Sequence, residues 1–175
     1  LESLRGFRVA PISLAAMWDT INTRILTETE ALRLSIARGG DDWEDGLVAA
    51  LHALTRQASR ATGGGDGYAA LEDRHLAFHR ALIAACGSDW LLDFSERLYV
   101  GAERYRYPAL IAGASDSQRD IAREHSALAE AALARDADAA AALLSDHYRR
   151  TGDFIERTLG ERLDAGQPVR RVRAS

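Results

Sequence analysis

Apolar residues recur at every third or fourth position along nearly the whole chain, and this period restricts its fold more than any other feature. The first run follows Ser13, a residue type that favours helix N-termini, and passes through Met17 and Ile21 until Gly39 and Gly40 end it. Side chains at this spacing lie along one face of an α-helix. The run therefore predicts one long amphipathic helix.

Five further runs carry the same period, separated from one another by glycine, proline or capping residues. The second helix is expected to start at a cap formed by Asp41 or Asp42 and to end near the glycine-rich segment 61–67. The remaining helices are expected from Tyr68 to Cys86, from about Asp89 to Pro108, from roughly Ser117 to Arg135, and from Ala137, after a cap at Asp136, to about Leu159. Gly152 is expected to be a weak point within the last of them.

The two ends of the chain lack this period. Residues 1–10 contain a Gly-Phe-Arg-Val-Ala segment ended by Pro11, which predicts a short strand left over from something upstream, and residues 161–175 are expected to be a flexible tail. Between them, residues 11–160 form the single domain expected for a chain of 175 residues. We expect an all-α fold, an antiparallel bundle of about six helices.

The charge balance and the single cysteine limit the function classes. The chain has 22 basic and 26 acidic residues, a net charge of −4, whereas a domain that binds nucleic acid directly is normally basic. Cys86 is the only cysteine, and the sequence has neither a secretory segment nor an apolar run of membrane length. These features predict a cytoplasmic protein with no membrane partner.

Four of the five histidines fall on the apolar faces of the expected helices. His75 and His79 lie four residues apart on one face of the third helix. His125 and His147 share faces with leucines of the fifth and sixth helices, whereas His52 lies about 100° of rotation from the apolar face of the second. We therefore expect four histidines to face the core and one to lie on its flank.

A single inward histidine is usually a core residue whose ring nitrogens bond to a carbonyl and a hydroxyl. Four in one core favour a different interpretation, because each must stay neutral and find partners, whereas one divalent metal ion accepts all their lone pairs. A pair on one helix and single residues from two facing helices can form such a site. Imidazole suits zinc, nickel, copper or iron(II), so zinc is the default and nickel or another metal stays open.

The run EHSALAEAALARDADAAAALLSDH, Glu124 to His147, resembles the C-terminal signature of the ligand-binding domain of GntR-type transcriptional regulators, the FadR-like C-terminal domain or FCD domain. AFHRALIAACGSDWLL is similar to the Phe-His segment and turn of that family, and TRILTE resembles its first-helix Arg-x-x-x-Glu, here Arg24 and Glu28. ALRLSI, DDWE and SERLYVGAERYRY resemble, less specifically, the carbon-starvation-induced regulator subgroup. The resemblance implies a helical, dimeric, effector-binding domain.

Where members of that family hold a metal, the ligands are a carboxylate four residues before the histidine of the Phe-His pair, that histidine and two later histidines. Carried over, the resemblance implies the metal ligands His75, His79, His125 and His147. Position 75 departs from the family pattern, in which Asp or Asn is usual. The change removes one anionic ligand, which would leave more of the metal's charge for an anionic effector.

The resemblance also implies a ligand for the metal. A small organic acid would place its carboxylate at an open coordination position, while arginines hold its other end. The candidates are Arg24, Arg104 and Arg106, with Tyr99 and Tyr105 as wall residues. Each arginine has an alternative role as exposed helix charge, and Arg24 could simply form an ion pair with the carboxylate four residues later.

In such regulators a winged helix-turn-helix precedes this domain, and GFRVAP resembles its last wing strand and exit. The chain would then lack the DNA-reading module and reach operator DNA only through it. Paired winged helices read paired half-sites, so the resemblance also implies a homodimer.

Two other interpretations stay open. A metal-dependent hydrolase would need a general base close to the ion. The carboxylates beside the histidines are turned about 100° from the ligand face, and no HExxH motif, Ser-His-Asp order or glycine-rich phosphate loop is present; these carboxylates are Glu72, Asp73, Glu124 and Asp146. The second alternative is a structural dimerisation module in which the histidines satisfy a polar core without metal. The regulator interpretation, which involves no catalysis, is the one the resemblance favours.

Overall fold

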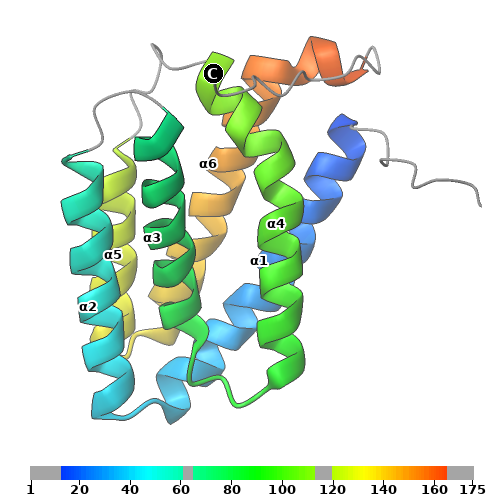
Figure 1. Cartoon of the computed structure of the whole chain (residues 1–175). Coiled ribbons are helices and arrows are strands. Elements are labelled where there is room, and N and C mark those ends of the chain that lie inside the picture. The colour runs from blue at the N-terminus through cyan, green and yellow to red at the C-terminus, as the bar shows by residue number, and fades with distance from the viewer. Residues whose placement is uncertain (1–12, 61–64, 113–119, 165–175) are drawn as a thin grey trace, which may run out of the picture.

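The computed structural model describes residues 13–60, 65–112 and 120–164, and this part of the chain folds into six α-helices without a strand (Figure 1). They are α1 (Leu14–Arg38), α2 (Asp41–Ala58), α3 (Gly65–Ile83), α4 (Asp89–Ala112), α5 (Ile121–Leu133) and α6 (Ala137–Asp164). The expected all-α bundle of six helices is confirmed. The strand expected within residues 1–10 lies outside the described residues, as does most of the tail expected from residue 161.

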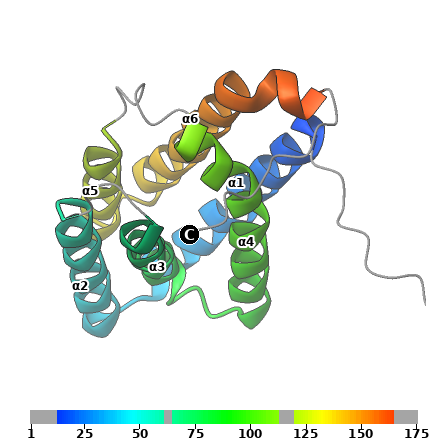
Figure 2. The same cartoon turned by 45° about the horizontal axis from the view of Figure 1, so that its top comes forward.

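The helices form two groups of three around a common interior. In Figures 1 and 2, α2, α3 and α5 stand together on one side and α1, α4 and α6 on the other. α1 packs against both α6 and α4, while α2 packs against α3 and α5. α1 runs antiparallel to α6, because Trp18 near its start bonds to Glu156 and Arg33 near its end pairs with Asp138. Among the described residues, no helix has the length and apolar character needed to cross a membrane.

Apolar faces at the helical period supply the core between these groups. The largest fully buried side chains are Tyr148, Phe78, Met17, Ile21, Leu32, Leu47, Leu82, Ile83, Leu128, Leu144, Ile155 and Leu159. Every helix except α4 contributes to this set, and α4 adds Tyr105 and Ala109. Burial of so many apolar side chains is the main stabilising contribution to the bundle.

Two of the expected helix caps are confirmed and one is wrong. The hydroxyl of Ser13 accepts a bond from the backbone N–H of Ala16 at 3.1 Å, and a carboxylate oxygen of Asp136 accepts one from Ala139 at 3.0 Å. The second helix is not capped by Asp41 or Asp42, since Gly40 holds the N-cap position without a side-chain bond. Both aspartates lie in the first turn instead, where their negative charge stabilises the helix by interacting with the positive end of its dipole.

Several expected boundaries shift because packing outweighs local stop signals. α4 passes through Pro108 and continues to Ala112, and Ala109 beyond the proline is fully buried. A proline removes one backbone hydrogen bond, but Ala109 directly after it still packs into the core. α3 ends at Ile83 rather than at Cys86, before a turn in which Gly87 has φ +70°. α5 begins at Ile121 rather than near Ser117, and α6 extends beyond Leu159 to Asp164.

Candidate metal centre

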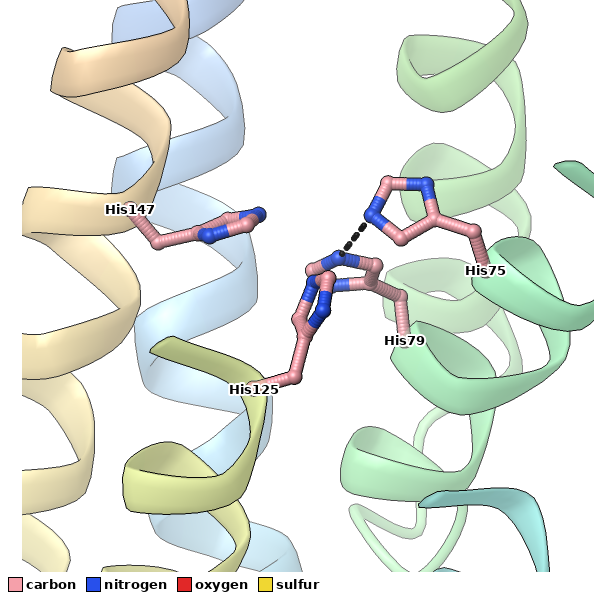
Figure 3. A group of neighbouring side chains, drawn as sticks. All are labelled: His75, His79, His125 and His147. Atoms are coloured by element: carbon pink, nitrogen blue, oxygen red, sulfur yellow. Dashed lines mark hydrogen bonds between the residues drawn. The ribbon is translucent and has the colours of Figure 1, made fainter. Parts of the chain in front are cut away.

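Four imidazole rings from three helices converge in the interior (Figure 3). His75 and His79 come from α3, His125 from α5 and His147 from α6, and one ring nitrogen of each lies within 4.8 Å of the others. The ring centroids of the α3 pair are 4.6 Å apart, and those of His125 and His147 are 4.8 Å apart. The inward orientation expected from the helical period is found for all four, and His52 is exposed, as expected.

Burial favours the neutral form of His75 and His79. His79, His125 and His147 are 3%, 2% and 5% exposed, whereas His75 is partly buried and lines a cavity. Loss of solvent lowers the pKa of His75 and His79 well below the ordinary value of 6.5, and the neighbouring imidazoles and arginines lower it further. Neutral rings have one lone pair each, which is the form that binds a metal ion.

The Nδ1 atoms of His75, His79 and His147 each lie beside a hydrogen-bonding partner. Nδ1 of His75 lies 3.0 Å from the hydroxyl of Tyr99, and Nδ1 of His79 lies 3.1 Å from the hydroxyl of Tyr148. Nδ1 of His147 lies 2.9 Å from a carboxylate oxygen of Glu124. The Nε2 atoms of His75 and His79 face each other at 3.1 Å.

Behind these partners lie two ion pairs, one buried and one partly buried. The hydroxyl of Tyr148 bonds to Glu28, whose carboxylate is paired with Arg24 at 2.8 Å. Glu28 and Arg24 are 1% and 4% exposed, so these two residues of the TRILTE motif point into the core and not to solvent. Behind Tyr99, the guanidinium of Arg106 holds Glu72 through both carboxylate oxygens and also pairs with Glu103.

The four residues expected to bind the effector occupy different places. Arg106 lines the cavity beside the histidines, and Tyr99 is buried with its hydroxyl against His75. Arg24 is buried behind His79 and does not line the cavity. Arg104 also lies away from the cavity wall, over the ring of Tyr105, which is a core residue 3% exposed.

A cavity of about 570 Å³ opens on one side of the histidine cluster. Its inner end holds His75, His125 and His147, and its charged residues are Glu72, Arg106 and Arg157. The apolar wall is made by Leu54, Ala58, Leu71, Leu110, Ile121, Ala122 and Phe154. Such a space accommodates a small molecule that has a polar end near the histidines and an apolar body.

Several residues of the site could not be found from the sequence. Tyr148 has the period of a core residue, and Arg157 looks like exposed helix charge. Glu72 and Glu124 were expected to turn away from the ligand face, but their side chains are long enough to reach Tyr99 and His147 from the adjacent helical position. Asp73 and Asp146 are exposed, as expected of such neighbours.

The residues present fit a divalent metal ion. Four imidazoles with no thiolate make a donor set for zinc, nickel, copper or iron(II). Neighbouring nitrogens on one ion at about 2.0–2.1 Å are separated by roughly 3 Å, and the Nε2 atoms of His75 and His79 are 3.1 Å apart. Partners on the outer nitrogen, such as Tyr99, Tyr148 and Glu124, are what metal-binding histidines usually have.

Comparisons with known proteins agree with this architecture. A sequence profile of the FCD domain matches residues 19–150. The uncharacterised HTH-type transcriptional regulator BphR of Paraburkholderia xenovorans (strain LB400) is 40% identical over 147 residues, which cover 83% of this chain and 59% of that protein. The HTH-type transcriptional repressor GlaR of Escherichia coli (strain K12) is 36% identical over 161 residues, 89% of this chain and 71% of that protein.

Proposed function

This chain belongs to the FCD domain family, and on that basis we propose that it is the effector-sensing domain of a GntR-type transcriptional regulator. We assign a divalent metal ion to His75, His79, His125 and His147, with zinc as the default and nickel as the next choice. The observation that carries the assignment is the convergence of four imidazoles at the inner end of an apolar cavity.

The effector in this proposal is a small organic acid. A bound metal ion would supply a cation for its carboxylate, and the apolar wall would cover its body. Arg106 and Arg157 are the cavity arginines, so we assign the contact with the acid to them and not to Arg24 or Arg104. Arg106 is already paired with Glu72 and Glu103. Arg157, at the exposed end of the cavity, is therefore the arginine whose charge is less neutralised.

DNA binding and dimerisation belong to the whole protein. The chain spans 59% of BphR and 71% of GlaR, both of which are named as HTH-type regulators. We propose that an N-terminal winged helix-turn-helix reads operator DNA in a homodimer and that effector binding in this domain changes its affinity. A tenfold change needs about 1.4 kcal/mol of coupling, which is within what a carboxylate–metal contact together with an arginine pair can supply.

A metal-dependent hydrolase is the second candidate, since a metal ion can activate water. The carboxylates nearest the cluster, Glu72 and Glu124, are both held in hydrogen bonds with other side chains, so neither is placed as a general base. A metal-free structural module is the third. The named relatives are regulators, which favours the first candidate.

One experiment distinguishes the three candidate functions. The protein is purified without a histidine tag, its metal content is measured by mass spectrometry, and its melting temperature is followed with short carboxylic acids and their neutral amides. The proposal expects about one divalent ion per chain and a rise in melting temperature with the acids alone, because a ligand that binds only the folded state stabilises it. Protein without metal, or hydrolysis of esters or amides at enzyme rates, would overturn it.

A further inference from the structure

Two matching series of side chains lie behind the α3 histidines. We call the first the α1 relay, and it consists of His79, Tyr148, Glu28 and Arg24. We call the second the α4 relay, and it consists of His75, Tyr99, Glu72 and Arg106. Each runs from an imidazole through a tyrosine hydroxyl to a carboxylate held by an arginine. The hydrogen count in each relay decides which nitrogen of the imidazole carries its proton.

In the α1 relay only one arrangement of the hydrogens satisfies every donor and acceptor. The hydroxyl of Tyr148 has one hydrogen, and Glu28, an acceptor only, lies 2.5 Å away. Arg24, a donor only, contributes an N–H to the same hydroxyl oxygen at 2.9 Å. The hydroxyl hydrogen is therefore committed to Glu28, so His79 must donate from Nδ1 across 3.1 Å. Its Nε2 is left with a bare lone pair.

The α4 relay leads to the same result. The hydroxyl of Tyr99 lies 3.1 Å from Glu72 and 3.2 Å from a donor nitrogen of Arg106, so His75 would also donate from Nδ1. His147 donates from Nδ1 to Glu124, because a carboxylate can only accept. Three Nε2 atoms are thus arranged as acceptors.

Two of these acceptors conflict unless a cation lies between them. The Nε2 atoms of His75 and His79 are 3.1 Å apart, and two lone pairs at that distance repel. A metal ion removes the conflict. Without one, a neutral pair can bond only if one ring moves its proton to Nε2, which reverses the relay behind it.

The α4 relay is the one that can reverse. Tyr148, Glu28 and Arg24 are all 4% exposed or less, and loss of the Tyr148 bond would leave Glu28 with Arg24 as its partner in a site closed to solvent. Tyr99 is 3.1 Å from Glu72, a longer bond, and Glu72 keeps both contacts with Arg106 if that bond is lost. Tyr99 can then turn its hydrogen to Nδ1 of His75.

The geometry points to unequal roles for the two α3 histidines. The α1 relay is a positioning device that fixes His79 in the metal-binding tautomer in advance, and His75 exchanges its ring proton between Nε2 and Nδ1 when a cation enters. His75 keeps one ring proton throughout, and Tyr99 transfers its hydrogen bond from His75 to Glu72. The fixed tautomer of His79 is independent of the metal, whereas the exchange at His75 rests on the proposed function.

Nitrogen NMR tests both halves, because two-bond ¹H–¹⁵N correlations distinguish a protonated ring nitrogen from a bare one. In metal-stripped protein we expect His79 protonated at Nδ1 and His75 protonated at Nε2, and after addition of zinc chloride we expect both protonated at Nδ1. His79 protonated at Nε2 in the stripped protein would overturn the α1 relay. If zinc does not bind, the exchange at His75 falls with the proposed function, while the His79 tautomer still decides the positioning role.

Three variants extend the test. Tyr148→Phe is expected to release the His79 tautomer and to weaken zinc binding by about 10–100-fold, the usual effect of losing such a partner. Tyr99→Phe should change the signals of His75 alone. Tyr105→Phe, a buried tyrosine outside both relays, is the matched control and should leave tautomers and zinc affinity unchanged. If Tyr148→Phe does not fold, the His79 tautomer of the metal-stripped wild type, which needs no variant, still decides the α1 relay.

Discussion

Gly152 of α6 lies directly against the indole of Trp18 on α1, so closely that a Cβ at position 152 would come within 2.6 Å of the ring. Trp18 is held there by a bond from its indole nitrogen to Glu156 at 2.8 Å. α1 and α6 supply ligand-side residues to the centre, namely the Arg24–Glu28 pair, His147 and Tyr148. The approach of these two helices therefore helps to place His147 and Tyr148 relative to the Arg24–Glu28 pair.

Replacement of Gly152 by alanine should destabilise the protein by about 1–3 kcal/mol, because the added methyl group forces the indole or the helix to move. Gly160→Ala in the same helix is the control, since a Cβ there meets only Glu156 at 3.9 Å, and it should stabilise by up to about 1 kcal/mol through helix propensity. Urea unfolding of both variants measures the difference. Equal free energies of unfolding for the two would contradict the packing argument.

The helical period predicted the helices and the inward histidines. The spacing of the apolar residues shows which face of each helix is buried, and the four histidines lie on those faces. It could not predict that Gly152 is a contact point, since a glycine inside a helix looks the same whether it weakens the helix or admits a partner. The sequence likewise suggested a stop at Pro108, whereas burial of Ala109 keeps α4 helical. Tertiary contacts decided both positions.

The sequence singled out the four histidines, Tyr99 and Arg106, but not most of the side chains that partner them. The four-residue spacing of His75 and His79 places them on one helix face, and Glu28 follows Arg24 at the same spacing. The partnership of Tyr148 with Glu28 joins positions 120 residues apart, and no local pattern encodes it. Glu124 was assigned outward from its rotation about the helix axis, which ignores the reach of a long side chain to His147.

Removal of His79 should abolish stoichiometric metal binding. In His79→Ala one of four nitrogens within 4.8 Å of one another is lost, and with it the α3 pair that holds the ion from one helix. We expect zinc to raise the melting temperature of the wild type but not of the variant. His52→Ala, at an exposed position, should retain the full shift. A variant that still takes up one tightly bound zinc ion would contradict the assignment of this ligand.

The metal-free protein should lose stability as the pH falls below about 6.5. Burial depresses the pKa of His75 and His79 in the folded state, so the unfolded chain binds protons in a range where the folded chain does not. Each such histidine contributes on the order of 1 kcal/mol of lost stability per pH unit below 6.5. Thermal unfolding between pH 7.5 and 5.5 in the presence of a chelator measures the effect.

The steepness with which stability falls with pH shows which histidines cause the loss. His79→Gln removes one of the two groups, so its stability should fall less steeply with decreasing pH than that of the wild type. His52→Gln should follow the wild type, because His52 is exposed. A wild-type stability that stays constant from pH 7.5 to 5.5 would show that the histidines are protonated equally in the folded and unfolded states.

Filling the cavity should block the effector and spare the metal. Leu71→Trp adds bulk to the apolar wall on α3, one helical turn before His75 and on the same face, so a small acid would lose the space for its body while the imidazoles stay in place. We expect calorimetric titration of the zinc-loaded variant with succinate to show at least a tenfold weaker affinity, with zinc content unchanged. Leu26→Trp, on the exposed face of α1, carries the same added bulk and should bind like the wild type. Unchanged affinity in Leu71→Trp, for a ligand that binds the wild type and is refused as its neutral diamide, would place the effector outside this cavity.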